Sequence, residues 1–376
     1  MSIATGIIGA SGFAGGELAR LLAGHPEFSL CYASVPGHSP DLVGKPLAAV
    51  HPHLRAGRAV EALPSKNGGS AGSLELVRTK TSEAARRCEV VFLATPPLVS
   101  AALGPALLAA GVEVVVDLSP AFRLRDPALH SKWYPAVSRP PERTAVYGLP
   151  ELNRALLPGA DLIAAPGCLA TAAILALMPL SGLDGVRLSS ITIDGKAGST
   201  GSGHRLRSSG LHPVRSGVVA PYAPAGHRHV AEIQEALLGK GLATVGGGLR
   251  LGMSVFGVDL VRGVSVAAHV IVDPDSRLPS EGELASLYRD AYRDAAFVRV
   301  IHWREEAVPL PDPKTLTGSN YCDIAVFQDA DCGRLVIVAA LDNLMKGAAG
   351  QAIQACNIRY GLPETLGIDA FAVYPG

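Results

Sequence analysis

The residue best placed for covalent chemistry is a cysteine that directly follows a proline–glycine pair. Cys168 comes after Pro166 and Gly167, and it opens an apolar run, CLATAAILALM, with the composition of a helix. A thiol in the first turn of a helix has a lowered pKa, because the helix dipole favours the thiolate. A thiolate can attack an activated acyl group and retain it as a thioester. The alternative is a buried structural cysteine, which is the commoner fate of a cysteine among alanine and leucine.

Two histidines flank an arginine in residues 226–233 (GHRHVAEI), just before a second helical pattern. A histidine near the thiol could take its proton and later return one to the product, and of the two we favour His229 over His227. Arg228 could hold an anionic substrate group, and we expect Glu232 to bind substrate as well. A metal site is a weaker alternative, because this spacing lacks further ligands, so we predict none. A merely structural histidine pair is the other alternative.

Residues 9–15 (GASGFAG) form a glycine-rich turn between an apolar strand and a helical pattern. Gly9 permits a tight turn, Gly12 lets backbone N–H groups approach a pyrophosphate, and Gly15 allows close packing of strand and helix. An ordinary strand-to-helix turn is the alternative. The predicted cofactor contacts of this turn are Gly9, Ser11, Gly12, Phe13, Ala14 and Gly15.

The next strand pattern, 28–34, ends without the acidic residue that usually holds the ribose of NAD. Ser34, Ser39 and Lys45 supply hydroxyl and cationic groups there, which favours NADP. Further cofactor contacts are predicted after other strands, at Thr95, Pro96 and Ser199.

Two more polar loops leave predicted strands. Residues 194–203 (DGKAGSTGSG) suit a phosphate or nicotinamide contact through backbone N–H groups and Lys196, although a flexible linker has the same composition. Ser119 and Arg123 lie just beyond a strand whose carboxyl end should face a ligand, and we expect them to bind substrate. A solvated loop arginine is the alternative.

Strands alternate with helical patterns as far as about residue 150, which predicts an α/β fold with a Rossmann-type parallel sheet. Residues 56–75 read as a surface insertion. Beyond residue 150, strands at 186–194, 249–260, 264–272 and 334–341 predict a second α+β domain with a mixed or antiparallel sheet. A last helix over 343–360 should return to the first domain. We therefore expect a dinucleotide-binding domain, 1–152 with 343–376, and a catalytic and oligomerisation domain, 153–342.

The composition excludes several classes of function. The 376 residues carry 33 basic and 33 acidic side chains, so the net charge of zero argues against nucleic-acid and anionic-membrane binding. No apolar run reaches the roughly 18 residues that span a bilayer, and the N-terminus lacks a signal-peptide pattern. Six cysteines without a CxxC motif indicate reduced thiols in a cytoplasmic protein. Apart from Cys168 we expect them to be unreactive.

Taken together, these segments resemble the N-acetyl-γ-glutamyl-phosphate reductases and the carrier-protein-linked aminoadipyl-phosphate reductases, relatives of aspartate-semialdehyde dehydrogenase. The resemblance implies that Cys168 is the nucleophile, that a histidine of 227–229 is the acid/base, that Asn343 and residues 347–350 approach NADP, and that the enzyme is a homodimer or homotetramer. The motifs that carry it run in order along the chain: 9–22, HPHLR (51–55), DLSPAFRLRD (117–126), YGLPELNR (147–154), PGC (166–168), GHRHVAEI (226–233), GSNYCD (318–323) and DNLMKGAAGQA (342–352).

Differences between this chain and the arginine-pathway members of the family indicate which substrate it takes. Arginine-pathway members usually have NPGC followed by an aromatic residue, whereas this chain has APGC followed by Leu169. Together with residues 208–229 and 258–263, this looks closer to the lysine type, whose acyl phosphate is tethered to a small acidic carrier. Reduction of free N-acetyl-γ-glutamyl phosphate is the main alternative. Aspartate-semialdehyde dehydrogenase and a non-catalytic nucleotide sensor fit less well. A basic patch that could receive the carrier comprises Arg205, Arg207, Arg215 and Arg228.

Overall fold

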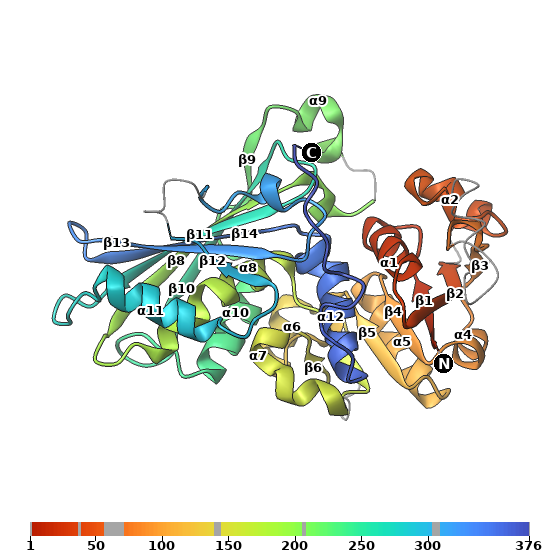
Figure 1. Cartoon of the computed structure of the whole chain (residues 1–376), viewed down its shortest axis with the longest axis horizontal. Coiled ribbons are helices and arrows are strands. Elements are labelled where there is room, and N and C mark those ends of the chain that lie inside the picture. Colours follow the sequence, from red (N-terminus) through yellow and green to blue (C-terminus); the bar gives the residue numbers. More distant parts are fainter. Residues whose placement is uncertain are drawn as a thin grey trace. The chain divides into compact units, whose positions relative to one another are not determined.

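Two seven-stranded sheets organise the chain, one in each of two units (Figure 1). Unit 1 comprises Met1–Pro166 with Ala348–Asp369, and unit 2 comprises Gly167–Gly347 with Ala370–Gly376. The computed structural model describes residues 2–36, 39–55, 71–138, 144–204, 208–302 and 309–375. Most of the predicted insertion, and Arg205 and Arg207 of the predicted basic patch, therefore lie outside the described residues.

The sheet of unit 1 is parallel throughout, in the order β3-β2-β1-β4-β5-β7-β6. Its central strands are short apolar runs such as VVFL (90–93), buried at every position, as expected for strands covered on both faces. This confirms the predicted Rossmann-type sheet. The elements are β1 (Ile3–Ile8), α1 (Phe13–Ala23), β2 (Phe28–Val35), α2 (Leu47–Val50), β3 (Val77–Arg78), α4 (Thr81–Arg87), β4 (Val90–Leu93), α5 (Pro97–Ala109), β5 (Val114–Asp117), α6 (Pro127–Trp133), β6 (Val146–Tyr147), α7 (Pro150–Asn153) and β7 (Leu162–Ala164).

The sheet of unit 2 is mixed, in the order β12-β13-β14-β11-β8-β10-β9, which confirms the predicted second sheet. Helix α8 packs on β11 and β14 and on α10. Every residue from Leu169 to Leu177 is buried, as expected of a helix that has no polar face. The elements are α8 (Cys168–Leu177), β8 (Leu188–Ala197), α9 (His212–Arg215), β9 (Val219–Ala223), α10 (His229–Gly239), β10 (Leu251–Val258), β11 (Val264–Val272), α11 (Glu281–Ala291), β12 (Val298–Val300), β13 (Cys322–Asp329) and β14 (Arg334–Leu341).

Two element boundaries differ from the predictions. Strand β8 continues to Ala197, so Lys196 lies within the strand and not on the loop after it. The last helix, α12 (Gly350–Arg359), begins later than residue 343, after a π-helical turn over Met345–Ala349. The cause is Asp342, whose Oδ1 accepts the N–H groups of the next residues, Leu344 at 2.8 Å and Met345 at 3.3 Å. Helix α12 then packs on α7 in unit 1.

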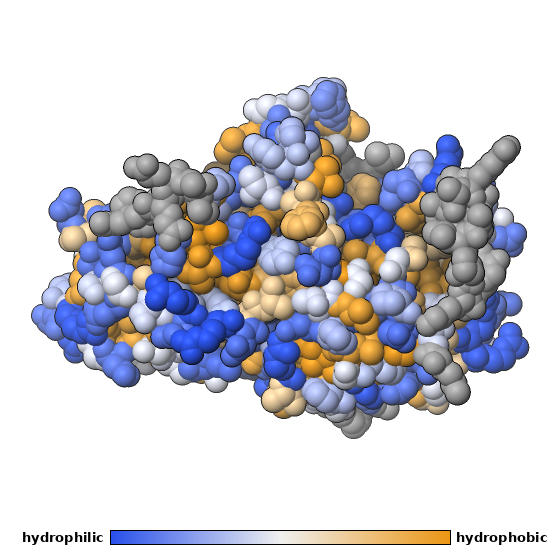
Figure 2. Space-filling view, viewed as in Figure 1, coloured by the Kyte–Doolittle hydropathy of each residue, from blue (hydrophilic) through white to orange (hydrophobic). Residues whose placement is uncertain are grey.

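Surface helices show the polarity expected of their positions. Helix α11 buries Leu284 and Tyr288 and starts with a capping box between Ser280 and Glu283. Figure 2 shows hydrophilic residues gathered over this part of unit 2. Across the described ranges, no helix combines the length and the apolar character that crossing a membrane requires.

Candidate active site

The glycine turn of unit 1 depends on residues without a Cβ atom. Gly9 has φ +90°, and a Cβ there would lie 2.4 Å from the carbonyl oxygen of Ala94. A Cβ on Gly15 would lie 2.5 Å from the Gly9 oxygen, whereas one on Gly12 would meet nothing nearer than 3.7 Å. The turn therefore has no room for a side chain at Gly9 or Gly15, whereas the space beside Gly12, just before helix α1, is open. It stands where the strand order changes direction between β1 and β4, so a pyrophosphate fits here.

A histidine holds this turn from the side. His51 is buried, and its Nε2 lies 2.8 Å from the carbonyl oxygen of Ala10. Its ring fills the space beside Gly16, where a Cβ would approach the ring to 2.6 Å. The sequence contained this residue in the HPHLR motif but gave no reason to place it against the glycine turn.

The other predicted cofactor residues of unit 1 lie at strand ends. Ser34 is fully buried, and its Oγ lies 3.0 Å from Oγ1 of Thr79. Thr95 Oγ1 lies 2.8 Å from Ser100 Oγ. Ser39 precedes a single 3-10 turn, Pro96 precedes α5, and Ser11, Phe13 and Ala14 occupy the start of α1, half-buried or exposed. Beside Ser34, the last residue of β3 and the N-cap of α4 have exposed cationic side chains that the sequence analysis overlooked: Arg78 and Lys80.

The loop after β5 is held by a buried carboxylate. Asp117 accepts hydrogen bonds from the N–H and Oγ of Ser119 at 3.0 and 2.8 Å, and burial raises its pKa to about 6 despite those bonds. Arg123 is 8 % exposed and donates to the carbonyl oxygens of Ala165 and Leu118. Ser119 and Arg123 were predicted to bind substrate, but these contacts fix the loop to its own unit.

In unit 2, Cys168 is the first residue of α8, as the sequence predicted. Gly167 precedes it in extended conformation, and its carbonyl oxygen accepts both the N–H and the Oγ1 of Thr171, at 2.8 and 3.1 Å. The half-buried thiol residue packs tightly against Gly347, where a Cβ would lie 2.6 Å from the Cys168 Cβ. The sequence analysis gave Gly347 no such role, because the contact joins residues far apart in the chain.

Helix α10 brings a histidine and a carboxylate to the same turn. His229 is its first residue, and its Nε2 lies 3.8 Å from Oε1 of Glu232. The other oxygen of Glu232 accepts the N–H of Gly167 at 3.0 Å. Glu232 is 2 % exposed, so this carboxylate supports the thiol turn, whereas the sequence analysis assigned it to substrate.

His227 stands edge-on to His229, with ring centroids 4.6 Å apart. Burial and then the positive charge of Arg228 lower the pKa of His227 to about 4, although Glu232 acts in the opposite direction. This imidazole is therefore neutral at neutral pH.

Tyr222, which the sequence analysis did not single out, completes the arrangement. Its ring lies 6.0 Å from that of His227. Although the residue is 57 % exposed, partial burial and then the nearby charge of Cys168 raise the pKa of Tyr222 to about 12. The residues around the thiol are thus linked in one chain of neighbours: Tyr222, His227, His229, Glu232 and Gly167.

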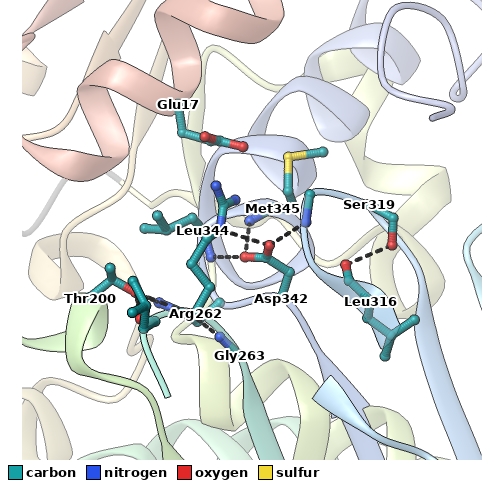
Figure 3. A network of polar contacts seen from close by, with 12 residues as sticks. Glu17, Thr200, Arg262, Gly263, Leu316, Ser319, Asp342, Leu344 and Met345 are labelled. Carbon is teal, nitrogen blue, oxygen red and sulfur yellow. Dashed lines mark hydrogen bonds and ion pairs between the residues drawn. The ribbon is translucent and has the colours of Figure 1, made fainter. Parts of the chain in front are cut away.

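A second polar network in unit 2 includes Thr200, Arg262, Gly263 and Asp342 (Figure 3). The predicted cofactor residue Asn343 is bonded to two of these residues. Its Oδ1 accepts the N–H of Gly263 at 2.6 Å, and its Nδ2 donates to Thr200 Oγ1 at 3.0 Å. The buried Asp342 accepts Arg262 Nε at 2.9 Å. Ser199, next to Thr200, donates its N–H to the carbonyl oxygen of Leu260. The network fixes the loop that carries Ser199.

The remaining cationic residues of the prediction have separate surroundings. Lys196 pairs with Asp194 at 2.5 Å. Arg215 donates to the carbonyl oxygen of Ala197 at 2.8 Å and lies against Gly257, so its guanidinium supports the sheet edge. Of the four arginines expected to form a basic patch, only Arg228 is both described and exposed.

The two units match two family models. Residues 4–160 match the semialdehyde dehydrogenase NAD binding domain, and residues 168–343 match the semialdehyde dehydrogenase dimerisation domain. A protein of Thermomicrobium roseum named as a LysW-L-2-aminoadipate 6-phosphate reductase is 40 % identical over 382 residues, covering 100 % of both chains. One of Natronomonas pharaonis named as a LysW-L-2-aminoadipate/LysW-L-glutamate phosphate reductase is 39 % identical, covering 98 % of this chain and 97 % of its own.

Solved structures share the fold at low sequence identity. Aspartate semialdehyde dehydrogenase II of Vibrio cholerae, complexed with ASA, has a TM-score of 0.66 and 16 % identity, covering 96 % of this chain and 99 % of its own. The aspartate semialdehyde dehydrogenase of Candida albicans, solved with NADP, has a TM-score of 0.61 and 16 % identity, covering 95 % and 98 %.

Proposed function

Since the chain belongs to the family of LysW-linked aminoadipate and glutamate phosphate reductases, with semialdehyde dehydrogenase domains, we propose that it reduces a carrier-linked acyl phosphate to its semialdehyde through a thioester on Cys168. The observation that carries this proposal is the thiol at the start of α8, directly after Gly167, whose N–H is bonded to Glu232 of α10. His229 lies beside that carboxylate, and His227 packs against His229. The substrate class comes from the names of the full-length relatives: a 2-aminoadipyl or glutamyl phosphate whose amino group is blocked by a carrier protein.

In the first half-reaction the Cys168 thiolate attacks the acyl carbon, a C–S bond forms, and the C–O bond to phosphate breaks. The start of α8 favours this step through two separate effects. Its dipole stabilises the thiolate, and its first backbone N–H groups can bind the oxyanion of the tetrahedral intermediate. Thr171 keeps Gly167 in place through two bonds to one carbonyl, so these N–H groups hold a fixed direction.

In the second half-reaction the thioester carbon becomes an aldehyde carbon, and reduced nicotinamide supplies the hydride when it is bound. The family model assigns residues 4–160 to NAD binding, and we assign the pyrophosphate to the Gly9–Gly15 turn. We favour NADP, because Ser34 stands where an acidic residue would select NAD, and Arg78 and Lys80 are exposed beside it.

The proton transfers are assigned to His229. Its Nε2 lies 3.8 Å from Oε1 of Glu232, and this carboxylate orients the imidazole that takes the thiol proton and returns one to the product. His227 is the weaker candidate, because its pKa of about 4 makes it a poor base at neutral pH. Its neutral ring instead packs against His229 and keeps that side chain in place.

We propose that the functional form is a homo-oligomer built through unit 2, since residues 168–343 match a dimerisation domain. Domain roles follow the same division: unit 1 would hold the dinucleotide, and unit 2 the nucleophile and its acid/base.

The deciding experiment runs the reaction in reverse. The enzyme is mixed with NADP, phosphate and either carrier-bound aminoadipate semialdehyde or N-acetylglutamate semialdehyde, and NADPH absorbance is followed. Turnover with the carrier-bound aldehyde alone supports the proposal. Turnover with the free acetylated aldehyde alone would overturn the substrate class and leave the thioester chemistry standing. Persistent turnover after alkylation of Cys168 would overturn the thioester itself.

A further inference from the structure

Two cysteines far from Cys168 lie side by side in unit 1. The sulfur atoms of Cys31, on β2, and Cys88, after α4, are 3.8 Å apart, although 57 residues separate them in the chain. The sequence analysis expected both to be unreactive, and their separation along the chain gave no reason to place them side by side.

Backbone irregularities bring the pair together. Thr5 of β1 pairs with Leu30 and the next residue, Gly6, pairs with Tyr32, so Cys31 is the extra residue of a bulge in β2. On the other side, a Cβ on Gly6 would lie 2.8 Å from the Cys88 sulfur. A glycine at position 6 therefore leaves the space that Cys88 occupies. Because β1 lies between β2 and β4, a bond between the two sulfurs would join both neighbours of β1.

The two thiols differ in accessibility and in acidity. Cys31 is half-buried, and its sulfur lies 3.2 Å from the carbonyl oxygen of Arg87, whose guanidinium bonds to the Cys31 carbonyl. The hydrogen bond from Cys88, assisted by the charge of Arg87, lowers the pKa of Cys31 to about 7. The same hydrogen bond and burial raise the pKa of Cys88, which is 5 % exposed. At neutral pH Cys31 is thus partly ionised and partly accessible, whereas Cys88 is protonated and sheltered.

We propose that Cys31 and Cys88 are a modification site, at which hydrogen peroxide produces a reversible disulfide. The Cys31 thiolate attacks one peroxide oxygen, an S–O bond forms, the O–O bond breaks, and water leaves after protonation. Cys88 then attacks the sulfenic sulfur of Cys31, an S–S bond forms, the S–O bond breaks, and a second water carries away the Cys88 proton. Two electrons pass from the two sulfurs to the peroxide. The sulfurs must approach from 3.8 Å to about 2.0 Å, which needs side-chain rotation and a small backbone shift.

The test uses the full chain with Cys168→Ala, so that the nucleophile of the main reaction cannot consume the oxidant. After treatment with hydrogen peroxide and alkylation, proteolysis and mass spectrometry should find the Cys31 and Cys88 peptides linked, with the loss of two hydrogens. Dithiothreitol should separate them. Cys332 is exposed and is not in a disulfide, so it serves as the internal control. Its peptide should be recovered alkylated or oxidised, and not linked to another cysteine. Independent oxidation of Cys31 and Cys88 without a link, or no oxidation of either, would overturn the proposal.

A second measurement does not depend on peptide recovery. The linked protein should melt several degrees higher than the reduced protein, because the bond closes a loop of over fifty residues in the unfolded chain. Cys31→Ser changes the more exposed partner, and it should abolish both the link and the shift while folding normally. A shift that persists in Cys31→Ser would show that another oxidation is responsible.

Discussion

Helices α1 and α8 begin with the same local structure, but we assign cofactor binding to the first and catalysis to the second. Each follows a parallel strand and a turn that contains glycine, and each leaves the first N–H groups of a helix available. At α1 the turn 9–15 contains three glycines, and Gly12 leaves open space above the backbone. At α8 the N-cap is also a glycine, Gly167, but the first helical residue is Cys168, and Gly347 packs against its Cβ.

The difference separates binding from catalysis. A helix start that binds an anion through N–H groups needs only room, which glycines supply without further support. A helix start that activates a side chain needs that side chain fixed in position, and it needs neighbours that manage protons. This explains why the turn before Cys168 is bonded to the buried Glu232 of α10, which has His229 beside it.

The largest effect should come from removing the side chain that distinguishes α8. Cys168→Ser should lower kcat by at least ~10³-fold, because a hydroxyl is a far weaker nucleophile than a thiolate. The affinity for NADPH, measured by fluorescence titration, should not change. Cys332→Ser is the matched control and should retain full activity. Near-wild-type turnover by Cys168→Ser would mean that Cys168 is not the nucleophile, and α8 would then have no catalytic role that α1 lacks.

A smaller loss should follow from moving the thiol without removing it. In Gly347→Ala the new Cβ would lie 2.6 Å from the Cys168 Cβ, so one of the two must shift. A displacement of about 1 Å at a reacting group costs on the order of 10²-fold in rate. The rate of Cys168 alkylation by iodoacetamide should change as well. Gly282→Ala, in helix α11 with open space around it, is the control and should change neither rate.

At α1 the equivalent perturbation should affect binding and not chemistry. Gly15→Ala would put a Cβ 2.5 Å from the Gly9 oxygen and push the helix away from the turn. Overpacking of this kind costs about 1–3 kcal/mol, so the Kd for NADPH should rise roughly tenfold while kcat at saturation is retained. Gly24→Ala, at the other end of α1, has no contact nearer than 3.9 Å and is the control. A fall in kcat at saturating NADPH would contradict the division of roles.

Local patterns in the sequence were enough to predict both helix starts. Glycine spacing predicted the turn before α1, and the Pro166–Gly167 pair with an apolar run predicted a helix that begins at Cys168. Both predictions depend on neighbours in the chain, where backbone conformation and helix period act directly. The two sheets followed from the same kind of pattern.

Contacts between distant segments could not be predicted this way. Gly347 against Cys168, His51 against Ala10 and the bond from Gly167 to Glu232 each join segments far apart in the chain. The sequence analysis therefore assigned Glu232 to substrate by its position near the histidines. The sequence analysis expected Ser119 and Arg123 to bind substrate because they follow a strand end, and it could not foresee the hydrogen bonds that hold both side chains within unit 1.

The smallest expected effect concerns stability, and it tests whether the α8 turn depends on the protonation of its neighbours. His227 has a pKa of about 4 in the folded protein and about 6.5 when unfolded, so between these values the unfolded chain binds more protons. Its contribution to stability is complete above pH 6.5 and is lost as the pH falls towards 4. Asp117, whose pKa is raised to about 6, has the opposite sign over the same range.

Comparison of wild type with His227→Gln isolates the histidine from Asp117. Between pH 7 and pH 5 the wild type should lose about 2 kcal/mol more unfolding free energy than the variant, because glutamine takes up no proton. Urea unfolding at the two pH values measures the difference, and His212→Gln on the exposed helix α9 controls for the loss of a histidine as such. Equal losses in wild type and His227→Gln would mean that His227 is not held neutral. His227 would then be able to take up a proton near neutral pH, and the assignment of the proton transfers to His229 and not to His227 would lose its basis.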